Sequence, residues 1–467
     1  MPIINASQFI TELDRSENLC DQLALALRQK IQQGILEAGT RLPATRALAN
    51  ELEVSRTTTQ LAYDQLSAEG YIVSRRGCGT FIADMAATIA SLSPKPASGN
   101  YSGLSAYGQS LLKTDFYPYF DTVAKPEKDS DFDFRCGLPD ANLFPHKQWL
   151  KAQRKILRST NLNHMHFLQA QGVAELRKNL VRHLKRNRGL HCREEQILVT
   201  SGFQQNLQIM MRILCEKRDQ ILTEYPGYPV VETMANAEGL QVSKVEVDES
   251  GISVSDLEKK SNSNARLLYV TPSHQYPLGV VLPVERRRAL IAWANKRNTF
   301  ILEDDYDGEF RYAGAPIEAL MSLDDNERVV FMGSFSKTMS VGIRLGFMVL
   351  PESLVEAAAK ARWCMGGFNQ VIDQLTMAAL IADGTYDKHV KRCKLIYSKR
   401  RKELIGALSK SLKCSYKITG DQAGLHLTIW IPGLNKTKML KLIAMTETAG
   451  LRISALVNRQ FSGAVSE

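Results

Sequence analysis

Long apolar runs are missing from this chain. No stretch of its 467 residues approaches the roughly 18 consecutive apolar residues that a membrane-spanning helix needs. The segment 1–18 also lacks the basic and then apolar pattern of a secretory signal. Apolar residues make up 44% and charged residues 23%, as in ordinary globular proteins. We therefore expect a cytoplasmic protein with one large and one small domain, or with two to three domains.

Cysteine motifs and histidine clusters are scarce as well. The eight cysteines contain no Cys-x-x-Cys pair, so neither a disulfide framework nor a zinc ribbon is indicated. His164 and His166 form the one close histidine pair, but no Cys or carboxylate lies nearby at ligand spacing. A structural role is favoured for this pair. We expect reduced thiols and no bound metal.

The net charge of +10 suggests a polyanionic partner, but its distribution is uneven. The segment 10–83 carries eight Lys or Arg residues against nine Asp or Glu residues, so it is not basic. The excess lies instead around 151–193 and 388–413. Solvated helix faces are the favoured interpretation of both stretches, and an additional DNA contact is the alternative.

Three short helices are predicted near the start of the chain. Leucine or isoleucine recurs every fourth residue from Leu19 to Ile31, and Gly34 suits the end of such a helix. Thr45 can cap a second helix that contains Leu48 and Leu52. Ser55 can cap a third, and its spacing predicts an inward face of Thr58, Ala62 and Leu66. The link 53–54 has the length of a helix-turn-helix turn.

The third helix and the hairpin after it have the features of a DNA-reading element. With that inward face, the first turns of the helix present Ser55, Arg56, Thr57 and Gln60 outward, where recognition helices meet DNA. Segments 71–74 and 80–82 read as two strands joined by the basic, glycine-containing tip 75–79. Such a tip suits a minor-groove or phosphate contact. The alternative is a small helical domain with no DNA partner.

The residues of this region resemble the GntR family of bacterial winged-helix regulators over roughly 18–83. The resemblance rests on the segments 42–49, 54–58 and 66–72. It implies a winged helix-turn-helix DNA-binding domain, which we place at 10–83. The DNA contacts that it implies come from the second and third helices and the wing: Arg46, Ser55, Arg56, Thr57, Thr58, Arg76 and Gly77.

Periodicity fails between residues 84 and 130, where Ser, Pro, Gly and Tyr accumulate. We interpret this segment as a tether that lets the small domain reach either subunit of a dimer. From 131 to 467, strand-like runs alternate with helical patterns, which indicates an α/β domain with a mostly parallel central sheet. The four clearest runs are 196–200, 265–270, 299–303 and 328–332. Ligands bind beyond the carboxyl ends of such strands.

Chemically informative residues follow three of these runs. Ser201 and Gly202 begin a helix whose free N–H groups could hold a phosphate. Several carboxylates crowd the segment 303–307. Lys337 is flanked by two hydroxyl residues and followed by Arg344, as an aldehyde cofactor with a phosphate arm requires. Asp304 could then face a pyridine nitrogen. Each motif alone is more often a surface turn or a solvated loop.

Together the motifs resemble the fold-type I pyridoxal-phosphate enzymes of the aspartate aminotransferase superfamily, and most closely the MocR-type branch of GntR regulators. The segments that match are 133–145, 223–228, 271–277, 303–307 and 334–337. The resemblance implies pyridoxal 5'-phosphate as cofactor and Lys337 as the Schiff-base lysine. Asp304 would pair with the ring nitrogen, Tyr306 would bond the ring hydroxyl and Tyr228 would stack on the ring. The residues implied around the phosphate are Ser201, Gly202, Phe203, Ser334, Ser336 and Arg344.

Three positions depart from that family pattern. Tyr276 stands where an asparagine often contacts the ring hydroxyl, so that contact comes from His274 or Gln275 or is absent. Phe167 replaces a tyrosine that commonly reaches the partner subunit's cofactor phosphate. The C-terminal tail looks foreshortened, and the arginine for a ligand carboxylate has no clear position, although Arg452 and Arg459 are available.

These features favour a regulator over an enzyme. We expect a homodimeric transcriptional regulator that senses pyridoxal phosphate or a small amine, such as γ-aminobutyrate or taurine, and binds double-stranded DNA. Weak residual transamination is compatible with this view. The alternative is an active aminotransferase with an accessory DNA-binding domain. A protein that only stores the cofactor leaves the DNA-reading helix unexplained.

Overall fold

The computed structural model describes residues 13–84, 103–113, 132–134, 136–159, 169–312, 314–367, 370–454 and 456. The chain divides into two compact units, Met1–Gly103 and Leu104–Glu467. Among the described helices, none has both the length and the apolar character needed to cross a membrane.

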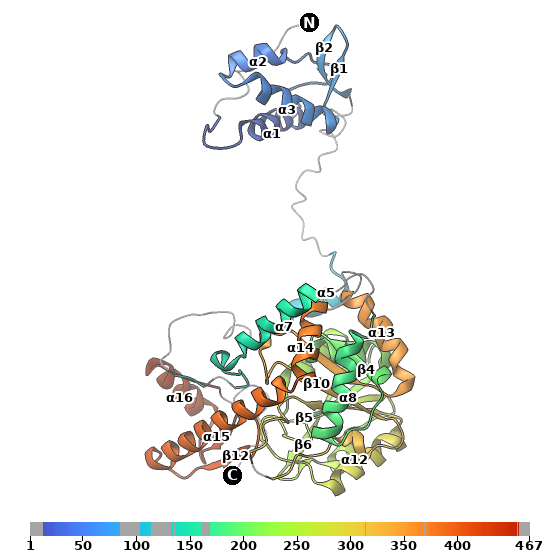
Figure 1. Cartoon of the computed structure of the whole chain (residues 1–467), viewed down its shortest axis with the longest axis vertical. Coiled ribbons are helices and arrows are strands. Elements are labelled where there is room, and N and C mark those ends of the chain that lie inside the picture. The colour runs from blue at the N-terminus through green and yellow to red at the C-terminus, as the bar shows by residue number, and fades with distance from the viewer. Residues whose placement is uncertain are drawn as a thin grey trace. The chain divides into compact units, whose positions relative to one another are not determined.

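The N-terminal unit is a three-helix domain with a β-hairpin (Figure 1). Its elements are α1 (Leu19–Gln32), α2 (Thr45–Glu51), α3 (Arg56–Ala68), β1 (Ile72–Arg75) and β2 (Gly79–Ile82), and the two strands pair antiparallel. The apolar stripe of α1 is buried against α2, α3 and the hairpin. Asn18 caps α1 by accepting a hydrogen bond from the backbone N–H of Cys20. The predicted helices and hairpin are all present.

Two local predictions in this unit are wrong. Thr45 begins α2 but makes no side-chain cap; Ala44 takes the N-cap position. The inward face of α3 contains Thr59 and Tyr63 with Ala62 and Leu66, while Thr58 is only half-buried. The reason lies in the cap, because Ser55 accepts from the backbone N–H of Thr58 and its hydroxyl lies 2.7 Å from that of Thr58. Thr58 therefore belongs to the helix end and not to the core.

The large unit is built on an eight-stranded sheet in the order β4-β11-β10-β9-β8-β5-β6-β7. Strands β6, β5, β8, β9 and β10 pair parallel along the row, while β11 and β7 run antiparallel to their neighbours. The sheet is therefore mixed but mostly parallel, as predicted. The strands are β4 (Ile197–Thr200), β5 (Gln220–Tyr225), β6 (Gln241–Asp248), β7 (Gly251–Ile252), β8 (Ala265–Val270), β9 (Phe300–Asp305), β10 (Val329–Ser334) and β11 (Gly346–Val349).

Helices cover both faces of this sheet, so its strands are buried on both sides (Figure 1). Alternate residues of one strand enter different cores: Val199 packs with α8 and α14, and Leu198 packs with α9 and α13. The helices are α7 (His146–Ser159), α8 (Ala174–Arg188), α9 (Phe203–Leu214), α10 (Pro229–Ala237), α11 (Val254–Lys260), α12 (Val284–Arg297), α13 (Glu352–Gly366), α14 (Val371–Ala382), α15 (Thr385–Ser411) and α16 (Lys436–Thr448).

Smaller elements complete the large unit. Strands β12 (Lys417–Thr419) and β13 (Thr428–Trp430) pair antiparallel, and β14 (Leu451–Ile453) pairs parallel with β3 (Phe132–Phe134). Within the segment predicted as a tether, α5 (Ala106–Lys113) packs on α10, where the Ser110 hydroxyl donates to the Ala237 carbonyl over 3.2 Å. His164, His166, Phe167 and Arg459, which the sequence singled out, lie outside the described residues.

Candidate cofactor site and DNA-reading helix

The candidate site lies where β9 and β10 end. These neighbouring strands are parallel, and their register places Asp304 beside Met332 and Asp305 beside Gly333. The carboxylate segment after β9 and the lysine segment after β10 therefore leave the sheet at the same edge. Two motifs that are separate in the sequence meet there because parallel strands end together.

Lys337 is held in a largely buried position. Its Nζ donates a hydrogen bond to the carbonyl oxygen of Gly137 at 2.6 Å. Burial lowers the pKa of Lys337, although the nearby Cys136, Asp307 and Asp304 oppose this effect. A less basic amine is more often neutral and hence more nucleophilic toward an aldehyde.

Asp304 faces the same site from β9. Its side chain is buried and accepts a hydrogen bond from the Tyr269 hydroxyl at 2.7 Å. Burial raises the pKa of Asp304 to about 7, although the Tyr269 hydrogen bond opposes this rise. A cationic ring nitrogen placed against this carboxylate would favour its ionised form.

Successive carboxylates of the predicted cluster point to opposite faces of the sheet, because they lie on the pleated strand β9. Asp304 points toward Tyr269, whereas its neighbours serve other contacts, as alternation along a strand requires. Glu303 is buried and accepts from the backbone N–H groups of Leu320 and Met321 at 2.6 and 2.9 Å. Asp305 pairs with Arg188 of α8. These buried carboxylates therefore have separate partners, and the alternative of a solvated loop is wrong.

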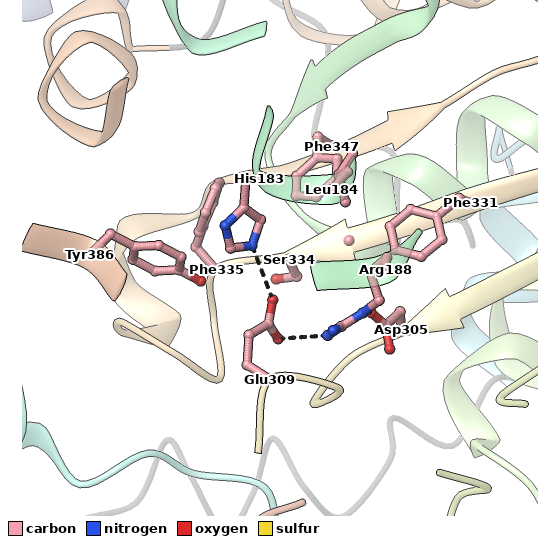
Figure 2. Close-up of a pocket in the computed structure, with 11 residues that line it drawn as sticks. His183, Leu184, Arg188, Asp305, Glu309, Phe331, Ser334, Phe335, Phe347 and Tyr386 are labelled. Carbon is pink, nitrogen blue, oxygen red and sulfur yellow. Dashed lines mark hydrogen bonds and ion pairs between the residues drawn. The ribbon is translucent and has the colours of Figure 1, made fainter. Parts of the chain in front are cut away.

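A buried ionic network stands behind this strand end (Figure 2). Arg188 bonds Asp305, and its guanidinium also lies 3.5 Å from Glu309, which is 3.7 Å from the His183 ring. Although burial favours the neutral acid, Arg188 and His183 lower the pKa of Glu309. No sequence motif indicated this network. The pocket around it is lined by His183, Leu184, Arg188, Asp305, Glu309, Phe331, Gly333, Ser334, Phe335, Phe347 and Tyr386.

His274 joins Tyr306 and Asp307 at the site. Its Nδ1 lies 2.9 Å from the Asp307 carboxylate, and the Tyr306 hydroxyl donates to the His274 carbonyl at 3.0 Å. Burial alone would lower the pKa of His274, but Asp307 outweighs it and the pKa is raised. Gln275 is committed to backbone groups, donating to the carbonyls of Pro226 and Tyr276. Of the two alternatives for a ring-hydroxyl contact, His274 is thus the better placed.

A C-terminal segment that the sequence reasoning missed reaches the same groups. The His426 ring stacks near that of Tyr306, with 6.4 Å between centroids, and lies 5.0 Å from that of His274. Burial lowers the pKa of His426 to about 4, so its ring is neutral at pH 7. Gly424 is needed for this approach, because its φ is +73° and a Cβ there would lie 2.1 Å from an Asp307 oxygen. Only the folded structure brings this segment to the site.

The side chains of His274, Asp307 and His426 also have ligand atoms within 4.8 Å of one another. Such spacing can hold a metal ion. Here the atoms already have other partners, since His274 bonds Asp307 and Gly420 and the His426 Nε2 lies 3.2 Å from the Pro277 carbonyl. These hydrogen bonds connect His274 and Asp307 with the C-terminal segment that carries Gly420 and His426.

The predicted phosphate residues gather around the start of α9. Gly202 has a φ of +110°, and a Cβ on it would lie 3.9 Å from an Arg344 nitrogen. Strand pairing aligns Ser334 with Gly346 and Gly346 with Thr200, so Ser334 and the residue before Ser201 flank the same glycine. The Ser334 hydroxyl donates to that of Ser336 at 2.9 Å. Backbone N–H groups, hydroxyls and a guanidinium thus meet at one helix N-terminus, a suitable arrangement for an anion.

Aromatic rings border the space between this helix end and Asp304. Tyr228 is the N-cap residue of α10, and its ring lies 5.6 Å from that of Phe203 and 5.5 Å from that of Tyr276. Phe203 also packs on Tyr269 at 5.7 Å. The Phe203 side chain thus belongs to an aromatic cluster, and only its backbone is available to a phosphate. An aromatic wall suits a flat ring.

The predicted DNA-contacting residues lie on the surface of the N-terminal unit. Arg56 and Thr57 are exposed in the first turn of α3, and Arg46 is exposed on α2. Arg76 and Gly77 are exposed at the hairpin tip, where Gly77 has a φ of +77°. The Ser55 and Thr58 hydroxyls bond each other at the cap, so they are less free to bond DNA.

Comparisons with known proteins agree with both halves of this description. Residues 19–82 match the family described as bacterial regulatory proteins, gntR family, and residues 137–458 match aminotransferase class I and II. The chain is 32% identical over 421 residues to the uncharacterized HTH-type transcriptional regulator YdeL of Bacillus subtilis, covering 89% of this chain and 84% of YdeL. It is 31% identical to the probable rhizopine catabolism regulatory protein MocR of Rhizobium meliloti, covering 87% and 80%.

The fold of the large unit is also found in solved aminotransferases. The crystal structure of Pyrococcus horikoshii kynurenine aminotransferase superposes with a TM-score of 0.68 at 23% identity, covering 76% of this chain and 88% of that one. At this identity the likeness establishes the fold alone.

Proposed function

The chain belongs to the MocR-type branch of the GntR family of bacterial transcriptional regulators, and from that premise we propose that it regulates transcription in response to pyridoxal phosphate or a small amine bound at Lys337. One observation carries this proposal. Lys337 and Asp304, both largely buried and each influencing the other's pKa, belong to a chain that also presents Arg56 on an exposed helix N-terminus. A chain built only for metabolism has no need of the second feature.

The residues at the strand ends fit pyridoxal phosphate. When bound, this cofactor supplies an aldehyde that reacts with primary amines. Lys337 would hold it covalently, Asp304 would keep its ring nitrogen protonated, and Tyr228 would cover the ring. Tyr306 and His274 would bond the ring hydroxyl. The groups proposed around the phosphate are Ser201, Gly202, the Phe203 backbone, Ser334, Ser336 and Arg344.

The contacts at this site connect a bound ligand to the position of the C-terminal region. The segment that carries Gly424 and His426 packs on His274, Asp307 and Tyr306, so a ligand that changes those contacts changes the docking of the C-terminal region. Regulation requires that the ligand bind two arrangements unequally. We propose that the C-terminal region is the part that shifts, within a homodimer whose two winged helices address two half-sites.

Electrophoretic retardation of DNA tests the regulator directly. Full-length protein with and without pyridoxal phosphate is mixed with the DNA upstream of its own coding sequence. Retardation, altered by the cofactor or by a small amine, is expected. Absence of retardation in both conditions would contradict a DNA-binding role.

The Arg56→Ala variant is expected to weaken specific binding about 10- to 100-fold, because one lost base contact costs roughly 1–3 kcal/mol. The measurement is a titration of a short operator fragment at fixed salt. Lys360→Ala provides the control, since it removes one exposed positive charge from α13 of the large unit. Equal losses in the two variants would assign the effect to net charge and not to Arg56.

An active aminotransferase is the second candidate, and the fold and the presence of Lys337 and Asp304 at one sheet edge favour it. Steady-state conversion of amino donors by the purified protein separates the two. We expect at most slow turnover, since the relatives YdeL and MocR are named as regulators and not as enzymes. Brisk multiple turnover would favour the enzyme.

A further inference from the structure

Helix α7 carries a stripe of positive charge on its solvent side. Lys147, Lys151, Arg154 and Arg158 are all exposed, and their spacing of four, three and four residues places them on one face of an α-helix. Trp149, which is buried, lies on the opposite face. The sequence 146–159 contains no acidic residue at all. We name the face of these four residues the α7 stripe.

The stripe is not neutralised within the described part of the chain. None of its four members has an ion pair or hydrogen bond to another described residue, while basic residues elsewhere are paired, such as Arg193 with Glu352. Like charges three and four residues apart repel one another along a helix. A polyanion laid along the stripe would remove that repulsion.

The charge distribution of the whole chain is compatible with this surface, because most of the α7 stripe lies in 151–193, one of the two segments with excess positive charge. The segment 10–83 has one more acid than base, so the remainder of the chain carries a net charge of +11. The N-terminal unit therefore has little general attraction for DNA phosphates, although such attraction supplies most non-specific affinity. Because the DNA-reading unit carries almost no net charge, attraction for DNA phosphates has to come from positive charge elsewhere in the chain.

We propose that the α7 stripe binds the phosphate backbone of duplex DNA within the same complex in which α3 reads the operator. This inference rests on the DNA-binding function proposed above. From Lys147 to Arg158 the helix rises about 16 Å at about 1.5 Å per residue. Duplex DNA presents one phosphate per about 1.7 Å of axis, so several phosphates face a stripe of this length.

The covalent connection permits both contacts on one DNA molecule. From Asp84 to Leu104 the chain can span at most about 70 Å, at about 3.3–3.6 Å per residue. The N-terminal unit therefore stays tethered within that span of Leu104, where the large unit begins. This is a contact of charge and not of sequence, so it should add affinity without adding discrimination between operators.

The test compares two full-length variants that lose the same number of charges. Lys151→Gln/Arg154→Gln/Arg158→Gln neutralises the stripe, and Lys259→Gln/Lys296→Gln/Lys360→Gln removes three exposed charges from α11, α12 and α13. Operator and unrelated DNA of equal length are titrated from 50 to 200 mM salt. We expect the stripe variant to lower the slope of log affinity against log salt by about 2 to 3, since each phosphate contact contributes about 0.9.

The other outcomes separate the alternatives. An unchanged slope, with Arg56→Ala still weakening operator binding, would overturn the stripe proposal and leave the regulator intact. Equal slope changes in both triple variants would overturn it too, because general charge would then be responsible. Altered mass by light scattering in the stripe variant would mean that α7 contacts a second copy of the chain. The single variant Arg158→Gln, expected to lower the slope by about 1, covers the case in which the triple variant does not fold.

Discussion

Replacing Lys337 with alanine is expected to abolish covalent attachment of pyridoxal phosphate. The Lys337 amine is largely buried at the strand end, has a lowered pKa and interacts electrostatically with Asp304, so it is the described lysine best suited to react with the cofactor aldehyde. The wild-type protein should show a visible absorption band after addition of the cofactor. Reduction with borohydride should then fix one cofactor equivalent on the peptide that contains Lys337.

Lys360→Ala is the matched control for this experiment, because Lys360 is an exposed lysine paired only with Glu356. It should retain the band and the labelled peptide. If the Lys337→Ala variant is labelled on a different lysine to the same extent as the wild type, Lys337 is not the Schiff-base lysine. Loss of the band with normal circular dichroism in Lys337→Ala would support it.

The part of this site that the sequence predicts is the part encoded locally. Lys337, Asp304 and Gly202 each follow directly on an apolar strand run, and the rule that parallel strands end together brings them to one edge. A reader of the sequence can therefore predict their proximity from strand order alone. The same locality explains why the helices and hairpin of the N-terminal unit are correctly predicted.

The parts that could not be predicted depend on tertiary contacts. His426 and Gly424 reach the site from a distant segment, and their neighbourhood in the sequence contains no motif to mark them. Periodicity also leaves Thr58 and Thr59 nearly equivalent, and only the cap hydrogen bond to Ser55 decides which of them is buried. Local patterns predict elements well and side-chain partners poorly.

Replacing Arg188 with methionine is expected to destabilise the large unit by roughly 3–5 kcal/mol, because it leaves Asp305 buried without its cation and Glu309 with His183 alone. Gly308 packs closely on Arg188 and Asp305, because a Cβ on it would lie 2.2 Å from an Asp305 oxygen. The backbone around Asp305 therefore has little room to rearrange when Arg188 is removed. The measurement is urea unfolding followed by near-ultraviolet circular dichroism. Lys185→Met on the same helix is exposed and should change stability by less than about 0.5 kcal/mol.

The deficit of Arg188→Met should depend on pH in a defined direction. In the wild type, Arg188 lowers the pKa of Glu309. The ionised Glu309 side chain therefore stabilises the folded state above the ordinary glutamate pKa of about 4.3, and this stabilisation is lost as the pH falls. Burial already raises the pKa of Asp305, with help from the Glu309 and Asp307 carboxylates, and Arg188 opposes this rise. In the variant this opposition is lost, so the pKa of Asp305 rises further and stability falls as the pH rises. Between pH 5 and pH 8 only the Asp305 effect operates, because Glu309 is already ionised at pH 5, and it makes the deficit larger at pH 8 than at pH 5. A deficit that is equal at both pH values would mean that Arg188 stabilises this strand end by packing and not by charge.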